Sequence, residues 1–337
     1  MKISCFPCYL CFIWNMKITI LSQYFYPEQF LISQLASELK NKGHDVHVLT
    51  GLPNYPKGEF FQGYSFWKGP FFEYYNKDVP VYRTPILPRG KGFFRLSLNY
   101  LSFILSAFIS TFRIPKSDIY LVYATSPITS AIPAIIHKFF SKTPVVIWLQ
   151  DLWPESLSAI LGIQKETLLY KVVEYLVRWI YKNTDYIFIQ SPRFKENLSQ
   201  YNFPLEYSDF IPSWGEELSH NPENINWINS IPNDKFKITF AGNIGIAQSI
   251  DTIFEAAILL KENNEILFLI VGDGRELERL KKQAKDINLN NIIFFGRKQF
   301  QDMATLFQKS DALLVTLKKQ EISEKTIPAK AVQYLAA

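Results

Sequence analysis

The sequence has very few cysteines, and their position limits what they can do. All three, Cys5, Cys8 and Cys11, precede Met16. Disulfide bonds therefore play no part in the rest of the chain, which fits a reducing compartment. The C-x-x-C-x-x-C spacing is compatible with a metal or iron–sulfur site, but a fourth ligand is missing nearby and the first histidine is His44. We therefore expect no metal.

Acidic residues are missing from a long stretch of the first half. Residues 79–117 contain no Asp or Glu but six Lys or Arg, and Asp118 is the one acid between Asp78 and Asp151. The whole chain has 36 basic and 31 acidic residues, and this net charge of +5 is too small to indicate nucleic-acid binding. The local basic stretch is the first departure from a uniform soluble surface.

The composition also lacks any sign of a disordered or repetitive chain. Of the 337 residues, 48% are apolar and 20% are charged, a globular balance that excludes a disordered or collagen-like chain. No low-complexity tract or short-period repeat is visible. The length predicts about two domains.

Short apolar runs alternate with stretches of helical periodicity in the first half of the chain. One helix is expected at Gln29–Lys40, ended by Gly43. Such alternation predicts a parallel sheet covered by helices. The expected strands are Ile18–Ser22, Val46–Thr50, Ile119–Tyr123, Val145–Leu149 and Tyr186–Gln190.

A proline-rich segment, Leu205–Asp234, interrupts this pattern and is typical of an interdomain linker. The alternation then restarts, which predicts a second parallel α/β unit. Its expected strands are Lys237–Phe240, Ile266–Val271, Ile292–Phe295 and Ala312–Thr316, and its expected helices are Ser249–Lys261, Arg275–Asp286 and Gln301–Lys309.

The predicted organisation is an N-terminal domain at 16–208, a linker at 209–235 and a C-terminal domain at 236–337. Residues 1–15 carry one charge and a short apolar stretch, with no small-residue cleavage site before Met16. We interpret them as an over-extended start. The alternative is a short membrane-seeking leader.

Two glycine loops follow expected strands of the second unit. Gly242 and Gly245 lie between a strand and a helix, where free N–H groups and the helix dipole suit a diphosphate. Gly272 and Gly274 flank Asp273 at the end of the next strand, where ligands gather in parallel sheets. Tight turns without a ligand are the alternative. The nicotinamide fingerprint G-x-G-x-x-G is absent.

Two acids follow the expected strand Val145–Leu149. Asp151 and Glu155 lie beside Trp153, so the carboxylates are candidates for binding sugar hydroxyls and the indole for stacking on a sugar ring. The alternative is that Asp151 caps a helix with Glu155 in its first turn.

A final helix is expected after Pro328, a residue that suits a first helical turn. Lys330 lies near its start and Gln333 one turn further, on the same face. Lys330 is a candidate for neutralising a phosphate, and a solvated lysine is the alternative.

These segments, in their order and spacing, resemble the retaining glycosyltransferases of family 4, and within it the WbuB-like branch that makes bacterial surface polysaccharides. The resemblance spans Met16–Ala337, and the family continues beyond this point, so we expect an incomplete C-terminal domain. The similar segments are Ser22–Phe30, Gly43–Val46, Thr50–Pro56, Gln150–Glu155, Ala241–Gly245, Val271–Gly274, Pro328–Lys330 and Tyr334–Ala337.

The resemblance implies two Rossmann-like domains of the GT-B fold. It also implies transfer of a sugar from a nucleotide-sugar donor, with retention and with no metal or other cofactor. The donor would bind mainly to the C-terminal domain, and a lipid-diphosphate-linked acceptor of O-antigen or capsule synthesis to the N-terminal domain. Asp151 and Glu155 would be catalytic, and the donor-binding residues would be Gly242, Asn243, Gly245, Gln248, Asp273, Gly274, Arg297, Lys330 and Gln333.

The chain departs from the family where charge is usually placed. The family commonly has two Glu eight positions apart on the last helix, where this chain has Lys325, next to Glu324, and Gln333. A common Arg and Lys in the first C-domain loop are replaced by Asn243 and Gln248. The diphosphate charge would therefore rest on Lys330, Arg297 and backbone N–H groups.

The acid-free stretch ends in an uncharged segment, Leu96–Phe112, in which Leu98, Leu101, Leu105, Phe108 and Phe112 share one helical face. It is shorter than the ~20 residues of a spanning helix, and a buried core helix is one interpretation. The basic residues before it favour a reversible interfacial anchor. We predict a peripheral protein on the cytoplasmic face of the inner membrane, with contacts from Arg89, Lys91, Phe93, Phe94 and Arg95.

Two other functions stay open. A non-catalytic relative that only binds nucleotide or membrane is favoured by the missing Glu and by the early end of the chain. A different two-domain Rossmann enzyme, such as a dehydrogenase, is opposed by the lack of a Gly-rich first loop. It is also opposed by Thr50, which stands where an acid would end the second strand.

Overall fold

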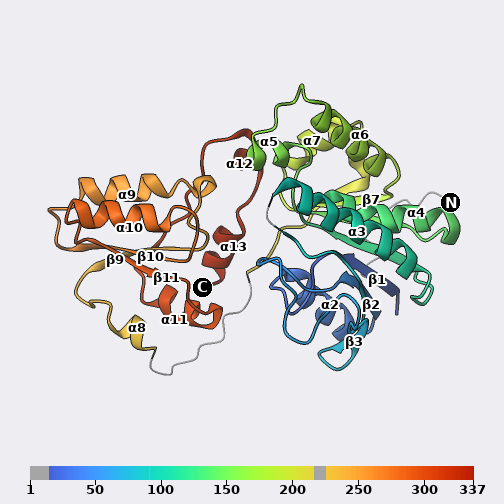
Figure 1. The fold of residues 1–337 in the computed structure, drawn as a ribbon, viewed down its shortest axis with the longest axis horizontal. Coiled ribbons are helices and arrows are strands. Elements are labelled where there is room, and N and C mark those ends of the chain that lie inside the picture. Colours follow the sequence, from blue (N-terminus) through green and yellow to red (C-terminus); the bar gives the residue numbers. More distant parts are fainter. Residues whose placement is uncertain (1–14, 91, 216–224) are drawn as a thin grey trace. The chain divides into compact units, whose positions relative to one another are not determined.

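The computed structural model describes residues 15–90, 92–215 and 225–337, and these form two compact α/β units (Figure 1). The division falls between Pro212 and Ser213, inside the segment 209–235 that we expected to be the linker. We call residues 15–212 the N-terminal unit and residues 213–337 the C-terminal unit. The expected leader, apart from Asn15, lies outside the described residues.

The N-terminal unit is built on an eight-stranded sheet with the order β3-β4-β2-β1-β5-β6-β7-β8. All neighbouring strands are parallel except β3 and β4. The strands β1, β5 and β6 are buried almost throughout, because helices cover both faces of the sheet. The bounds are β1 (Lys17–Ser22), β2 (Asp45–Gly51), β3 (Phe72–Tyr75), β4 (Val79–Thr84), β5 (Ile119–Ala124), β6 (Val145–Leu149), β7 (Tyr186–Ile189) and β8 (Ser208–Phe210).

Helices α2, α3, α4, α6 and α7 of this unit each bury part of their surface. In α3, Phe103 and Ala107 are buried, and this helix contacts α4, β2 and β4. The start of α6 is capped by Thr167, whose hydroxyl accepts the N–H of Tyr170 at 3.3 Å. The bounds are α2 (Leu31–Asn41), α3 (Phe93–Thr111), α4 (Ile132–Ser141), α5 (Glu155–Leu161), α6 (Leu168–Lys182) and α7 (Phe194–Gln200), with short 3₁₀ turns η1 (Ile128–Ala131) and η2 (Leu205–Tyr207).

The C-terminal unit has a four-stranded parallel sheet with the order β11-β10-β9-β12. Helices α9 and α10 lie on one side of this sheet and α11 on the other (Figure 1). Alternate residues of β10 point to these two faces: Phe268 and Ile270 pack with α9 and α10, and Leu267 and Leu269 pack with α11. The bounds are α8 (Asn226–Asn229), β9 (Phe236–Ala241), η3 (Ile246–Gln248), α9 (Ile250–Leu259), β10 (Ile266–Val271), α10 (Leu277–Asp286), β11 (Ile292–Gly296), η4 (Phe300–Asp302), α11 (Met303–Gln308), β12 (Ala312–Leu313), α12 (Glu321–Lys325) and α13 (Ala329–Ala336).

The structure confirms the expected strands of both units and adds three that the pattern did not predict. β3 and β4 form an antiparallel pair at one edge of the N-terminal sheet, so the expectation of a purely parallel sheet was wrong there. Pro80 lies in β4 before the pairing of this strand with β2 begins at Val81, so at this position β4 pairs only with the edge strand β3. β8 has three residues, and β12 ends at Leu313 rather than at Thr316.

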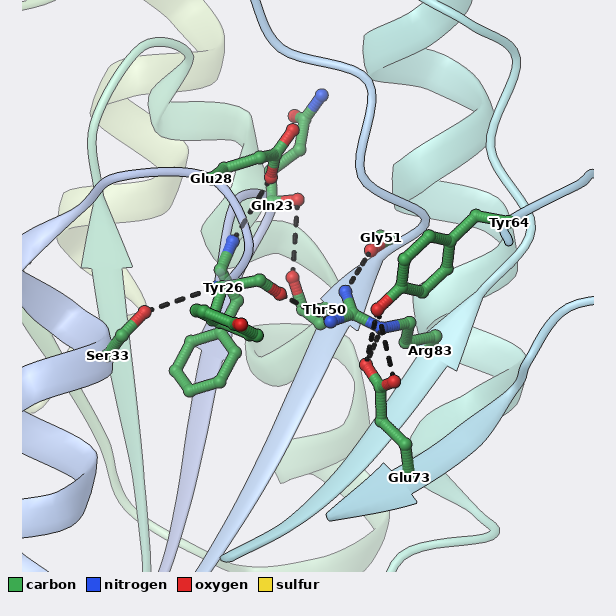
Figure 2. Close-up of polar contacts among 10 residues, drawn as sticks. Gln23, Tyr26, Glu28, Ser33, Thr50, Gly51, Tyr64, Glu73 and Arg83 are labelled. Carbon is green, nitrogen blue, oxygen red and sulfur yellow. Dashed lines mark hydrogen bonds and ion pairs between the residues drawn. The ribbon is translucent and has the colours of Figure 1, made fainter. Parts of the chain in front are cut away.

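A buried arginine holds the loops of the N-terminal sheet in place (Figure 2). Arg83 on β4 forms an ion pair with Glu73 on β3 and also donates hydrogen bonds to the carbonyls of Gly51 (3.2 Å) and Tyr26. Its guanidinium carbon lies 4.9 Å from the centre of the Tyr64 ring. These charge-assisted contacts tie the segment after β1 and the end of β2 to β3 and β4.

A second anchor of the same loops is the buried carboxylate of Glu28. Its oxygens accept the backbone N–H groups of Asn54 at 2.9 Å, Tyr55 at 2.7 Å and Phe25 at 3.2 Å. Burial raises the pKa of Glu28 to about 7, against the opposing effect of these hydrogen bonds. The loops that follow β1 and β2 are therefore joined through one side chain.

Candidate functional site

The two glycine loops of the C-terminal unit lie against each other at the carboxyl ends of β9 and β10. The N–H of Gly242 donates to the carbonyl of Val271 at 2.8 Å. A Cβ at Gly272 would lie 1.8 Å from the Gly242 oxygen, and one at Gly274 would lie 2.2 Å from the Ile244 oxygen. Only glycine fits at these positions, because the two backbones pass too close for a side chain.

The helix expected at Ser249–Lys261 is confirmed as α9, and a short turn that was not expected precedes it. A 3₁₀ turn, η3, follows Gly245, and Ser249 has a left-handed conformation with φ of 47°. α9 begins only at Ile250. The start of this helix is therefore separated from the glycines by one turn rather than directly behind them.

Lys330 projects from α13 onto the first glycine loop. Its ammonium group donates to Oε1 of Gln248 at 2.8 Å and lies 3.6 Å from the centre of the Phe240 ring. A Cβ at Gly242 would lie 2.5 Å from Cε of Lys330. Burial lowers the pKa of Lys330 to about 8. The structure thus brings Lys330, Gln248 and Gly242 together, and Lys330 is not the solvated lysine of the alternative interpretation.

Tyr334, which the sequence analysis missed, fixes α13 against β9. Its hydroxyl accepts the N–H of Ala241 at 2.9 Å and donates to the carbonyl of the same residue at 3.2 Å. β12 pairs with β9 only at Ile238 and Thr239. The Tyr334 hydroxyl therefore bonds backbone groups of β9 that a longer β12 would otherwise pair with. Tyr334 is four residues after Lys330, and this one-turn spacing was the available signal.

The other predicted donor-binding residues lie on the two glycine loops, after β11 and further along α13. Asn243 and Asp273 are exposed on the two loops, and Asp273 accepts the N–H of Gly274 at 2.7 Å. Arg297 is exposed after β11, and Gln333 is half-buried on α13. Pro328 precedes α13 as its N-cap residue rather than lying in its first turn.

In the N-terminal unit, Asp151 follows β6 and is half-buried. Burial raises the pKa of its carboxyl to about 6. α5 begins at Glu155 with Pro154 before it and no side-chain cap, so Asp151 is not a helix cap. Glu155 accepts a hydrogen bond from Asn197 on α7 at 2.8 Å, and Trp153 is only 7% exposed. The expectation that Trp153 stacks on a sugar ring is therefore wrong for this structure.

Arg89 lies in a cluster of tyrosines at the carboxyl edge of the N-terminal sheet. Its Nη1 donates to the Tyr24 hydroxyl at 3.3 Å, and its guanidinium carbon lies 5.2 Å from the centre of the Tyr55 ring. The pKa of Tyr100, on α3, is raised by burial and by the Asp151 carboxylate and is lowered by Arg89. The prediction that Arg89 contacts a membrane is therefore corrected: its side chain points into this cluster.

The remaining predicted membrane residues lie around the start of α3. Phe93 and Arg95 are exposed and Phe94 is 74% exposed, whereas Lys91 lies outside the described residues. α3 is the one helix in the described part of the chain that is long and apolar enough to cross a membrane by length and composition, and 22% of its most apolar window is buried. It packs against the sheet through Phe103 and Ala107, so the buried-helix interpretation holds for that face.

Metal ligands do not gather anywhere in the described ranges. Residues 15–90, 92–215 and 225–337 contain no group of three or more His, Cys, Asp or Glu that could hold an ion. The three cysteines of the C-x-x-C-x-x-C segment lie outside these ranges.

Comparison with known families places both units. Residues 31–214 match the model described as a glycosyl transferase 4-like domain, and residues 221–337 match the one described as glycosyl transferases group 1. The first match covers more than half of the chain, so the chain belongs to the glycosyl transferase 4-like family. The two Rossmann-like units are those of a GT-B glycosyltransferase, as predicted.

Individual relatives are distant in sequence but similar over most of their length. The putative colanic acid biosynthesis glycosyl transferase WcaI of Escherichia coli K12 is 24% identical over 95% of this chain and 81% of that protein. The sucrose-phosphate synthase of Thermosynechococcus elongatus aligns with a TM-score of 0.65, 15% identity, and coverage of 89% of this chain and 75% of that one. The Anabaena HepE structure with UDP and glucose aligns with a TM-score of 0.59, 15% identity, and coverage of 91% and 76%.

Proposed function

We propose that this protein transfers a sugar from a nucleotide-sugar donor to a lipid-diphosphate-linked acceptor in bacterial surface polysaccharide synthesis, such as that of O-antigen or capsule. The observation that carries the proposal is the position of Lys330, which lies beside the glycine loops at the carboxyl edge of the C-terminal sheet. The HepE structure with UDP and glucose supports a nucleotide-sugar donor.

In this proposal the donor diphosphate lies over Gly242–Gly245. The glycines allow the backbone to approach the phosphate oxygens closely. Lys330 supplies the nearest cation, and Gln248 holds its ammonium group at 2.8 Å. Arg297 and backbone N–H groups share the remaining phosphate charge, so that a metal ion is not needed for this role.

Asp151 is the residue that we assign to the acceptor. Transfer with retention requires the leaving phosphate and the incoming hydroxyl on the same face of the sugar, so positioning matters more than a strong base. With a pKa of about 6, the carboxyl is mostly ionised near pH 7 and accepts a hydrogen bond from a sugar hydroxyl. Glu155 is engaged by Asn197, which favours a supporting role behind Asp151.

We also propose that the protein docks on the cytoplasmic face of the inner membrane through α3 and the end of α4. Leu101, Leu105, Ile109 and Phe112 recur at helical spacing, and each is more than half exposed. The patch continues onto α4 through exposed Phe139 and Phe140, since the rings of Phe112 and Phe140 lie 6.1 Å apart. We call these six residues, together with Phe94, the α3–α4 face.

The occupant that suits this face is an anionic lipid surface. Arg95, Arg113 and Lys116 are exposed on or beside α3, and residues 79–117 contain no acid. Each basic group near an anionic leaflet contributes ~1 kcal/mol, and the apolar stripe adds burial at the headgroup boundary. Because the opposite side of α3 is packed on its own sheet, the helix would lie in the plane of the interface.

A ligand panel and a transfer assay test this function. UDP or GDP is expected to raise the melting temperature of the protein, because a ligand that binds only the native state stabilises it, whereas NAD is expected to have no effect. Transfer of radiolabelled sugar from a nucleotide sugar to a prenyl-diphosphate-linked acceptor is then measured. Stabilisation by NAD alone would favour the dehydrogenase alternative. Nucleotide binding without transfer, for any donor or acceptor tried, would favour the non-catalytic alternative.

A further inference from the structure

The guanidinium of Arg89 is a partly buried cation without a carboxylate partner among the residues that the structure describes. Its contacts are the Tyr24 hydroxyl at 3.3 Å and the face of the Tyr55 ring, and its backbone N–H donates to Oδ1 of Asn54 at 2.8 Å. Arg83, the other arginine of this region, has the carboxylate of Glu73. The two arginines therefore differ in how their charge is balanced.

A charge removed from water is costly unless an opposite charge or several hydrogen bonds compensate it. For Arg83 that compensation is internal, and this residue ties strands together. For Arg89 the surrounding groups are neutral aromatics and hydroxyls, which leave donors of the guanidinium fork available. The geometry points to an anion that comes from outside the chain.

The position of Arg89 in the fold indicates a substrate rather than a structural ion. Tyr24 follows β1, Tyr55 follows β2, Arg89 follows β4 and Asp151 follows β6, so all four lie at the carboxyl edge of the N-terminal sheet. Ligands of parallel α/β sheets bind at this edge. The pKa of Tyr100, on α3, is lowered by Arg89 and raised by Asp151, so both charges lie on the side of the sheet near this tyrosine.

We propose that Arg89 binds a phosphate of the diphosphate group of the acceptor, while Asp151 meets the hydroxyl of the attached sugar. A guanidinium fork matches phosphate oxygens in a bidentate manner, and the Tyr24 hydroxyl adds a neutral partner. This inference rests on the proposed function for the identity of the acceptor. The anion site itself rests on Arg89 and its neighbours.

Binding is tested on the full chain in a Lys330→Ala background, in which the donor site contributes less to diphosphate affinity. The probes are inorganic pyrophosphate and a short-chain prenyl diphosphate, titrated by calorimetry. Arg89→Gln is expected to weaken both about tenfold or more, and Arg89→Lys less, because the charge stays while the fork is lost. Arg193→Gln, at an exposed arginine before α7 that pairs with Glu196, is the matched control and is expected to change nothing.

A second measurement needs no variant at Arg89. Phenylglyoxal modification of arginines in the wild-type chain is followed by mass spectrometry with and without each diphosphate. The adduct at Arg89 is expected to form several-fold more slowly with the diphosphate, and that at Arg193 at an unchanged rate. The anion site would be overturned if Arg89 were modified at the same rate with and without the diphosphate. It would also be overturned if adding Arg89→Gln to the Lys330→Ala parent left the diphosphate affinity unchanged.

The outcomes also separate this inference from the proposed function. Binding of pyrophosphate without binding of the prenyl diphosphate would overturn the assignment to a lipid-linked acceptor. Arg89-dependent binding of the prenyl diphosphate in a chain that transfers no sugar would sink the transferase proposal and leave the anion site standing. Transfer that proceeds equally well in Arg89→Gln would overturn the role of Arg89 in acceptor binding and leave the transferase proposal standing.

Discussion

The two units offer ligands different kinds of groups at the same edge of similar sheets. In the C-terminal unit the candidate site is mostly backbone: glycine loops in close contact, with one lysine brought from α13. In the N-terminal unit it is mostly side chain: Tyr24, Arg89 and Asp151 on loops held by the buried residues Glu28 and Arg83. Backbone suits a group that is the same in every donor, such as a diphosphate, whereas side chains suit a partner that differs between enzymes.

The largest expected effect is a loss of turnover when the candidate site of the N-terminal unit is changed. Asp151→Asn removes the carboxylate and is expected to reduce turnover about 100-fold or more, because acceptor positioning is lost. Donor affinity should stay within twofold of wild type, because donor binding is assigned to the other unit. Single-turnover transfer and nucleotide calorimetry measure the two quantities separately. Normal turnover in this variant would reduce Asp151 to a structural residue.

The corresponding change in the C-terminal half removes its cation. Lys330→Ala is expected to weaken nucleotide-sugar affinity roughly 10- to 100-fold, since a hydrogen bond to a charged group contributes about 1.5–3 kcal/mol. Lys319→Ala, at an exposed lysine of the same unit, is the control and should bind normally. Calorimetry with the donor checks both variants, and an unchanged dissociation constant for Lys330→Ala would remove this residue from the site.

The α3–α4 face is a further difference between the two units, because it belongs to the N-terminal unit alone. Leu105→Ser/Ile109→Ser removes two exposed apolar side chains and is expected to weaken binding to anionic vesicles about tenfold, given ~25 cal/mol per Å² of buried apolar surface. Leu259→Ser, at an 85% exposed leucine on α9, is the control. Sedimentation at low and high salt measures the effect. A wild-type chain that stays in the supernatant with anionic vesicles at low salt would contradict membrane docking.

The pH dependence of donor binding tests the charge on Lys330. Its pKa is about 8 without ligand, and a bound diphosphate stabilises the protonated form and raises that pKa. Binding therefore takes up a proton above pH 8, so affinity is full below pH 8 and falls as pH rises, by at most about tenfold per unit. Calorimetry between pH 7 and 9.5 in buffers of different ionisation enthalpy measures both effects. The Lys330→Ala variant should show a flat profile.

The smallest expected effect concerns the missed tyrosine. Tyr334→Phe leaves the N–H and carbonyl of Ala241 without their hydroxyl partner, at a cost of about 1–3 kcal/mol to the C-terminal unit. Urea unfolding measures this loss. Donor affinity should fall a few-fold as α13, and Lys330 with it, becomes less well placed. Tyr175→Phe, at an exposed tyrosine on α6, is expected to do neither.

Most strands were predictable because burial on both faces produces unbroken apolar runs. Val145–Leu149 and Ile266–Val271 match β6 and β10 residue for residue. β3 and β4 escaped prediction because neither is an unbroken apolar run: the edge strand β3 has exposed aromatic residues, and β4 contains Pro80 and Arg83. The 3₁₀ turn between Gly245 and α9 was not predicted, because this turn and a left-handed Ser249 carry no clear sequence signal.

The residues of the candidate sites also fall into those that the sequence indicated and those that it did not. The glycine pairs were visible in the sequence, because only glycine tolerates such close backbones. The sequence also marked Asp151, since an acid directly after a buried strand lies at the ligand edge of the sheet. For Tyr334 the sequence offered only its one-turn spacing from Lys330, because the role of its hydroxyl depends on where β12 stops pairing with β9, two elements distant in the chain.

By itself, then, the sequence determined the two α/β units, their strand runs and the places where glycine loops and acids meet a sheet edge, because these follow from local periodicity and residue type. The tertiary structure alone decided which charges face which neighbours. Arg89 and Arg95 belong to one basic stretch, yet Arg89 turns into the tyrosine cluster and Arg95 stays exposed on α3. The direction of a side chain is set by packing between segments that lie far apart in the chain, and periodicity carries no record of it.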